Sequence, residues 1–176
     1  MEKVVVFSCT NRPDSFTLRV SKAYANLING LGFEAMVLDF RDLSPEMLLN
    51  EHYDGPAPEL IRLSEKYIRA QNRFIFISPE YNGSFPGILK LFLDKIPPRD
   101  WMHKQACLVG VSQGRAGNLR GMEHLTGILH YLKMHVYFNK LPISLVDKMV
   151  DEEGRFISAP QEKACLDQVR GFLALN

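Results

Sequence analysis

Apolar runs and amphipathic segments alternate along the chain. Five short runs rich in β-branched and aromatic residues are typical of buried strands, at residues 3–7, 34–39, 74–77, 106–111 and 135–138. Segments with helical spacing of apolar residues lie between and after them, at residues 16–31, 59–70, 86–96, 119–132 and 159–175. Strand and helix thus alternate about five times, which predicts an α/β fold: a five-stranded parallel sheet with helices on both faces.

One region is harder to interpret. Residues 41–58 contain a short apolar pattern around Met47 that indicates a helical turn, followed by a glycine- and proline-containing loop at residues 54–58. The region is too short to separate domains of sensible size, so residues 1–176 are expected to form a single domain.

Composition excludes several classes of function. Apolar content of 46%, charged content of 23% and a net charge of +1 are ordinary for a globular protein and give no electrostatic case for nucleic acid or an anionic membrane. No apolar run approaches the ~20 residues of a membrane span, and the N-terminus enters a strand without a signal-peptide pattern. The three cysteines are far apart and form no Cys/His cluster, so no metal site is expected and a reduced, cytoplasmic protein is the simplest interpretation.

Polar loops follow the first, third and fourth predicted strands, at residues 8–17, 78–84 and 112–118. In the doubly wound strand order 2-1-3-4-5 these three strands are neighbours, and a crevice opens where the order reverses between strands one and three. The three loops are therefore expected to converge on one ligand site at the carboxyl edge of the sheet.

The first loop has the chemistry of a phosphate cradle. Thr10, Ser15 and Thr17 supply hydroxyl groups, Arg12 supplies a forked cation, and the loop leads into a helix N-terminus. The alternative is a purely structural role, in which Ser15 only caps the helix and Arg12 is solvated.

The second loop carries a recognisable motif. The pattern P-E-Y-N-G-S-x-P-G-x-L-K over residues 79–90, with Asp94 following, resembles the signature loop of the NADPH-dependent FMN reductase family. The first loop is similar to that family's G-S-x-R-x-x-S-x-[NT] pattern, with Cys9 standing where the family often has glycine. The resemblance implies a flavodoxin-like three-layer sandwich that binds FMN and takes hydride from NADPH or NADH.

The resemblance also implies which residues contact the cofactor. The first loop would hold the phosphate, the second would line the flavin ring, and the third, similar to the family's S-x-G-x-x-G, would approach the pyrimidine edge. The resulting set is Thr10, Arg12, Ser15, Phe16, Thr17, Pro79, Glu80, Tyr81, Asn82, Gly83, Ser84, Ser112, Gln113, Gly114 and Gly117. Because the flavin carries the redox chemistry, no catalytic side chain is predicted.

Some roles stay open within these loops. Asn82 and Gly83 tolerate unusual backbone angles and suit a loop that presents N–H groups. Tyr81 is explained either by contact with the ring or by loop packing. Glu80 either contacts the cofactor or turns inward to accept hydrogen bonds from loop N–H groups. Arg115 either faces NADPH or is solvated.

The leading functional hypothesis is an NAD(P)H oxidoreductase that passes electrons through FMN to a quinone, flavin, azo compound or similar small acceptor in a ping-pong cycle. A flavodoxin-type electron carrier is the alternative, although such carriers tend to be acidic and this chain is near neutral. A phosphatase-like use of Cys9 is a weaker alternative, because C-x5-R chemistry requires arginine where Ser15 stands.

Assembly rests on the resemblance alone, which implies a homodimer or homotetramer with the flavin near the interface. Phe85, Trp101 and Met102 flank the predicted site and would serve a partner chain, an acceptor pocket or the core.

Overall fold

The computed structural model describes residues 3–49 and 57–175 and contains a parallel sheet. Its strand order is β2-β1-β3-β4-β5, and β6 also pairs with β4. The strands are β1 (Val4–Ser8), β2 (Ala35–Asp39), β3 (Arg73–Pro79), β4 (Gln105–Val111), β5 (His135–Val136) and β6 (Leu141–Ile143). The predicted flavodoxin-like fold class and strand order are therefore confirmed.

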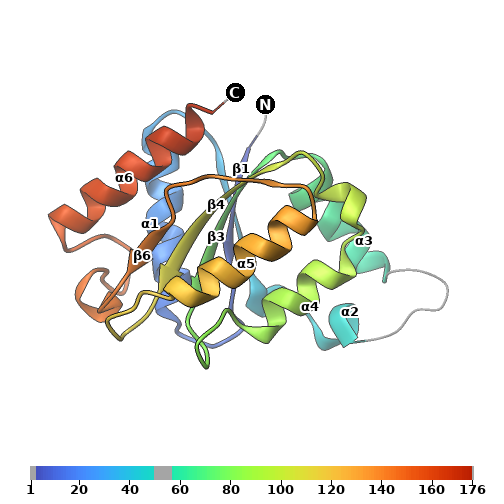
Figure 1. Cartoon of the computed structure of the whole chain (residues 1–176), viewed down its shortest axis with the longest axis horizontal. Helices are drawn as coiled ribbons and strands as arrows, with labels where there is room; N and C mark the ends of the chain where they lie inside the picture. The colour runs from blue at the N-terminus through green and yellow to red at the C-terminus, as the bar shows by residue number, and fades with distance from the viewer. Residues whose placement is uncertain (1–2, 50–56, 176) are drawn as a thin grey trace.

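Helices cover both faces of the sheet (Figure 1). On one face lie α1 (Phe16–Gly30) and α6 (Ala159–Leu173), and on the other α3 (Pro58–Ser64), α4 (Gly87–Lys95) and α5 (Leu119–Tyr131), with the short α2 (Pro45–Leu49) beside α4. Alternate residues of each strand enter two separate hydrophobic clusters: Val5 and Phe7 face α3–α5, whereas Val4 and Val6 face α1 and α6. Burial on both faces explains why the strands are continuous apolar runs.

The fifth strand differs from the prediction. The expected strand at residues 135–138 ends at Val136, and a second short segment, β6, continues the pairing with β4 further along. Between them, the Tyr137 N–H still donates to the Ala106 carbonyl of β4 at 2.7 Å. The Gln168 side-chain amide of α6 also donates to the carbonyl of Asn139 at 2.7 Å and to that of Leu108 at 3.2 Å. A sheet of six strands thus replaces the expected five.

Two other boundaries differ. The third strand continues past Ile77 through Ser78 and Pro79, which pair with Gly110 and Val111, so the polar loop begins later than predicted. The helix expected at residues 59–70 is α3 followed by a π-helical turn, η2 (Glu65–Arg69). The helical turn expected near Met47 is present as α2, whereas residues 54–56 of the predicted loop lie outside the described residues. Three 3-10 turns complete the elements: η1 (Phe40–Asp42), η3 (Pro98–Asp100) and η4 (Val146–Lys148).

Trp101 belongs to the core. Its side chain is fully buried among aromatic rings, with centroids 5.6 Å from Phe74 and 6.2 Å from Phe92. Of the roles open to Trp101, the structure therefore shows core packing. In the part of the chain that the structure describes, no helix has the length and apolar character needed to cross a membrane.

Candidate functional site

The three polar loops meet at the carboxyl edge of β1, β3 and β4, at the lower edge of the molecule in Figure 1 and opposite the two termini. They enclose an open cavity of about 610 Å³. Its lining consists of Arg12, Pro13, Asp14, Ser15, Phe16, Thr17, Pro79, Glu80, Tyr81, Val111, Ser112, Gln113, Gly114 and Val146. The predicted convergence of three loops on one cavity is therefore present in the structure.

The first loop ends in a capped helix N-terminus. Ser15 is the N-cap of α1, and its hydroxyl accepts a hydrogen bond from the Leu18 N–H at 3.2 Å. The first N–H groups of a helix have no intrahelical acceptor, and the helix dipole makes this end positive. Arg12 and Thr17 line the cavity beside it. Ser15 thus caps the helix, as in the structural alternative, and it also lines the cavity.

A hydrogen bond joins the first two loops. The hydroxyl groups of Thr10 and Tyr81 lie 2.8 Å apart, and the Thr10 hydroxyl also accepts from the Arg12 N–H at 3.2 Å. Thr10 is fully buried and does not line the cavity, whereas Tyr81 does. The Tyr81 hydroxyl is therefore engaged in holding the loop that carries Arg12, and its ring lies at the cavity wall.

The second loop is a tight hairpin turn. Tyr81 and Ser84 exchange two backbone hydrogen bonds, of 2.9 and 3.1 Å, and the residues between them, Asn82 and Gly83, have φ values of 51° and 77°. Positive φ at both central positions is the type I′ geometry, which favours the sequence Asn-Gly. The unusual backbone angles expected for this pair are confirmed.

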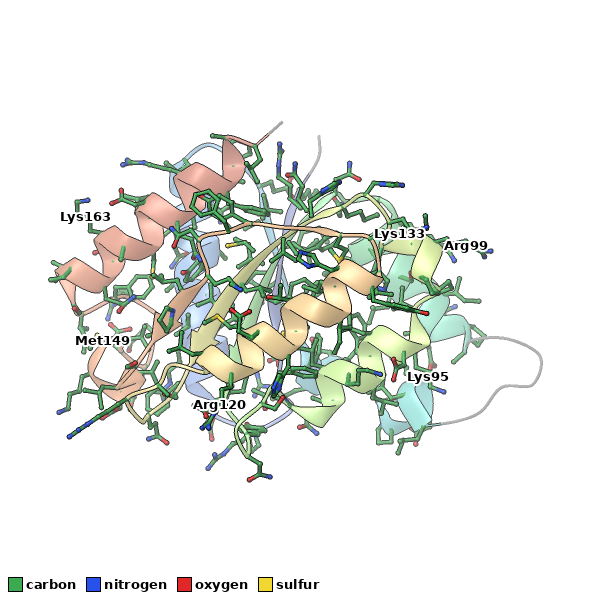
Figure 2. All side chains as sticks on the ribbon, in the orientation of Figure 1. Lys95, Arg99, Arg120, Lys133, Met149 and Lys163 are labelled. Carbon is green, nitrogen blue, oxygen red and sulfur yellow. The ribbon has the colours of Figure 1, made fainter. Side chains whose placement is uncertain are left out.

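The Glu80 side chain makes a contact that neither sequence-based alternative included. The Glu80 carboxylate lies 3.6 Å from the guanidinium of Arg120 in the first turn of α5. The Glu80 backbone N–H donates to the Val111 carbonyl at 3.0 Å. Figure 2 labels Arg120 at the same edge as the three loops. Glu80 is only 19% exposed against 74% for Arg120, so the arginine end of the ion pair lies in solvent.

The third loop is closed by its own serine. The Ser112 hydroxyl donates to the Gly114 carbonyl and accepts from the Gly117 N–H, both at 3.0 Å. Gly117 has a φ of 55°, and a Cβ there would lie 2.5 Å from the Cβ of Pro142 in β6. The glycine is therefore required by both backbone angle and space.

The predicted cofactor residues fall into two groups. Those that line the cavity are Arg12, Ser15, Phe16, Thr17, Pro79, Glu80, Tyr81, Ser112, Gln113 and Gly114. Those that shape the loops behind it are Thr10, Asn82, Gly83, Ser84 and Gly117. Ser84 is turned toward α5, where its hydroxyl lies 2.9 Å from Nδ1 of His124.

Several residues at the site carried no usable sequence signal. Val111 and Val146 line the cavity although both belong to ordinary apolar patterns, and Pro13 and Asp14 precede the helix without a recognisable motif. Asn118, at the end of the third loop, and Arg120, in the first turn of α5, flank the second loop. An asparagine directly before a predicted helix usually indicates a cap, so the sequence does not indicate the contact of Asn118 with β3.

Cys9 does not have the environment of a nucleophile. It is fully buried, its sulfur donates weakly to the Phe7 carbonyl at 3.5 Å, and burial raises its pKa well above the ordinary thiol value. A nucleophilic cysteine needs the opposite shift, toward the thiolate. Across residues 3–49 and 57–175, no group of three or more His, Cys, Asp or Glu is arranged to hold a metal ion.

The donor set suits a flavin mononucleotide. The arginine, the hydroxyls of Ser15 and Thr17 and the open end of α1 are complementary to a phosphate dianion. The backbone of the other two loops and the Tyr81 ring provide polar and flat surfaces for an aromatic ring system. A cavity of about 610 Å³ is within the usual range for cofactor sites. Fold and site together define a flavodoxin-like protein of the flavin-binding class.

Comparison with known proteins identifies the family. The family model for NADPH-dependent FMN reductase matches residues 2–146, and the chain belongs to this family. It is 29% identical to a 2-hydroxy-1,4-benzoquinone reductase from a Burkholderia species over 92% of this chain and 88% of the relative. It is 33% identical to an NAD(P)H-dependent FMN reductase from Pseudomonas aeruginosa over 73% of this chain and 72% of the relative.

A solved structure shows the same fold. The flavoenzyme NAD(P)H:(acceptor) oxidoreductase FerB from Paracoccus denitrificans superposes with a TM-score of 0.84, covering 98% of this chain and 96% of that chain at 24% identity. The family, the oxidoreductase class and the FMN and NAD(P)H cofactors expected from the sequence are confirmed by these findings.

Proposed function

We propose that this protein uses FMN to transfer electrons from NAD(P)H to a quinone, with free flavins and azo compounds as further acceptors. The observation that carries the proposal is the convergence of the β1, β3 and β4 loops on one cavity at the N-terminus of α1. The quinone as acceptor is supported by the Burkholderia relative, which is named as a benzoquinone reductase.

The chain's own residues bind and orient in this proposal. Arg12, Ser15 and Thr17 hold the phosphate, and Pro79–Ser84 and Ser112–Gly117 hold the ring through their backbone groups. Bound FMN supplies hydride acceptance and electron delivery. In the ping-pong cycle that we propose, the donor and the acceptor would enter the same open cavity in turn.

The test is steady-state NADPH oxidation with a benzoquinone acceptor, compared with NADH at equal concentration. We expect parallel double-reciprocal plots, because the donor must leave before the acceptor binds. Negligible NAD(P)H oxidation by FMN-loaded protein would instead favour the flavodoxin-type carrier, which receives electrons from a protein partner. The same comparison decides between the two nicotinamide donors.

The proposal includes a homodimer. A groove of about 420 Å³ runs between α4 and α5, and its lining combines the apolar side chains of Leu93, Ile96, Ile128 and Leu132 with Lys90, Asp94 and His124. Tyr131 stands at its edge with 83% of its surface exposed. A protruding aromatic side chain next to an apolar groove on the same face suits a two-fold interface, in which each copy fills the other's groove. Light scattering of wild type and Tyr131→Glu tests whether this face is the dimer interface. A tetramer requires a second interface.

Single-domain organisation over residues 1–176 and a cytoplasmic location complete the proposal. The sheet carries hydrophobic clusters on both faces that draw on segments from Val4 to Leu173. Cys9, Cys107 and Cys165 are free and buried in the described chain, as suits a reducing compartment. One cooperative unfolding transition and recovery in the soluble cell fraction are the expected results.

A further inference from the structure

Asn118 has an unusual position for a residue that precedes a helix. It is the N-cap of α5, with left-handed backbone angles of φ 60° and ψ 34°, and its side chain makes no capping hydrogen bond to that helix. Asparagine at this position ordinarily accepts a hydrogen bond from its own helix. Here the side chain is fully buried and extends to the neighbouring strand β3.

The amide of Asn118 binds the end of β3. Its Nδ2 group donates to the carbonyls of Ser78 and Pro79, both at 3.0 Å, and lies 3.3 Å from the Ser78 hydroxyl. Ser78 and Pro79 are the last residues of β3, and the second loop begins directly after them. A single side chain on the third loop thus fixes the starting point of the second.

Two glycines keep the space that this side chain occupies. A Cβ on Gly121 would lie 2.1 Å from Oδ1 of Asn118, and a Cβ on Gly110 would lie 3.1 Å from the Asn118 Cβ and 2.0 Å from the Gly117 carbonyl oxygen. The distances of 2.1 Å and 2.0 Å are too short for a side chain at either glycine, and at Gly110 the shorter contact is with the Gly117 carbonyl rather than with Asn118. The packing of β4 and α5 is therefore adapted to Asn118.

The other end of the amide is left unsatisfied. Oδ1 of Asn118 is buried and has no hydrogen-bond partner within the described residues. A buried unpaired carbonyl lowers stability, so stability alone does not explain an asparagine at this position. The contacts that remain are those of Nδ2 with the end of β3.

We propose that Asn118 is a positioning residue that sets the distance between the two loops that hold the flavin ring. This inference rests on the proposed function. Asn118 does not line the cavity, but Pro79, which accepts from it, and Gly114, in its own loop, both do. Loss of the amide is expected to change the spacing of the two ring loops, whereas the hydrogen bonds of the Asn118 amide do not reach the phosphate cradle at the start of α1.

The experiment compares FMN with riboflavin, which has the same ring and lacks the phosphate. Asn118→Gly keeps the left-handed backbone and removes the amide. We expect this variant to bind both flavins more weakly by the same factor, about tenfold. We also expect the visible absorption band of the bound flavin to shift. Lys133→Gly is the matched control, since Lys133 follows the other end of α5 with a φ of 59°, and it leaves both affinities and the band unchanged.

Several outcomes overturn the assignment. Asn118→Gly with wild-type affinities and an unchanged flavin band removes Asn118 from this role. If Asn118→Gly weakens FMN binding and leaves riboflavin binding unchanged, the substitution acts at the phosphate. That result also contradicts the proposal. Wild-type protein that retains neither flavin overturns the proposed function, and the Asn118 assignment with it.

A second variant covers the case in which Asn118→Gly does not fold. In Asn118→Asp the carboxylate form has no donor, while the protonated form donates one hydrogen bond to Ser78 or Pro79. Burial at this position is expected to raise the pKa of the new carboxyl above its ordinary value of about 3.9, so the riboflavin affinity of this variant should rise as pH falls toward about 5, whereas that of wild type stays constant. A pH-independent affinity equal to that of wild type would contradict the proposal.

Discussion

At the scale of single residues, the site contains two kinds of side chain. Some line the cavity, and others hold the loops in place behind it. Arg12 and Thr17 line the cavity, whereas the Thr10 hydroxyl is occupied by Tyr81 and by the Arg12 N–H. The motif shared with the family therefore contains both kinds. Sequence similarity identifies the positions, and only the hydrogen bonds distinguish their roles.

Arg12 is the residue whose change gives the clearest prediction. Arg12→Ala would remove the charge-assisted hydrogen bonds that we propose between Arg12 and the phosphate, each worth about 1.5–3 kcal/mol. FMN affinity is expected to fall by about tenfold to a hundredfold, while riboflavin affinity stays at its wild-type value. Fluorescence titration of the apoprotein with both flavins measures this. Equal losses for both flavins would show that Arg12 supports the ring or the fold, and not the phosphate.

At the scale of elements, the turn between β3 and α4 is constrained by its backbone angles. Its two central residues, Asn82 and Gly83, both have positive φ, and a Cβ on Gly83 would meet nothing closer than the Arg120 side chain at 3.9 Å. Space is therefore available at Gly83, and the backbone angle alone decides the effect of a substitution.

Gly83→Ala is expected to lower the free energy of unfolding by about 1–2 kcal/mol, because the left-handed conformation is unfavourable for alanine. Gly87→Ala, at the start of α4 with no neighbour within 4 Å, is the matched control. It should be neutral or stabilising by up to about 1 kcal/mol. Urea denaturation of both variants measures the difference. Equal stability changes at the two glycines would contradict the turn geometry.

Alternating patterns were enough to predict most elements. The strands at β1, β3 and β4 and the helices α1 and α5 follow from local periodicity, and strand order follows from the family's fold. The division of the last strand did not follow, because it depends on Gln168, which reaches Asn139 from 29 residues further along the chain. The role of Asn118 was hidden for the same reason, since its acceptors lie 39 and 40 residues away.

At the scale of the whole molecule, burial of the thiols links stability to pH. Burial raises the pKa of Cys9, Cys107 and Cys165 in the folded protein. Above the ordinary thiol pKa of about 8.5, the unfolded chain releases these protons and the folded chain keeps them. The unfolded state then binds fewer protons, so the stability contributed by the thiols is complete below about pH 8.5 and declines as pH rises.

We expect the free energy of unfolding to fall between about pH 8.5 and about pH 10, with each thiol contributing up to about 1.4 kcal/mol per pH unit. Cys107→Ala should reduce that slope. Val109→Ala, which removes apolar volume from the same strand and keeps every thiol, should leave the slope unchanged. Denaturation at a series of pH values measures both. An identical slope in wild type and Cys107→Ala would show that the thiol does not stay protonated.

The central claim is that three loops at one sheet edge hold FMN for reduction by a nicotinamide. The most direct measurement is the absorbance spectrum of the purified protein after FMN has been added and the excess removed, followed by NADPH in the absence of oxygen. We predict the two absorption bands of oxidised flavin, bleached by NADPH and restored by a benzoquinone. A colourless protein that releases all its FMN would contradict the three-loop site, and a stable yellow protein that NADPH does not bleach would contradict the reductase function.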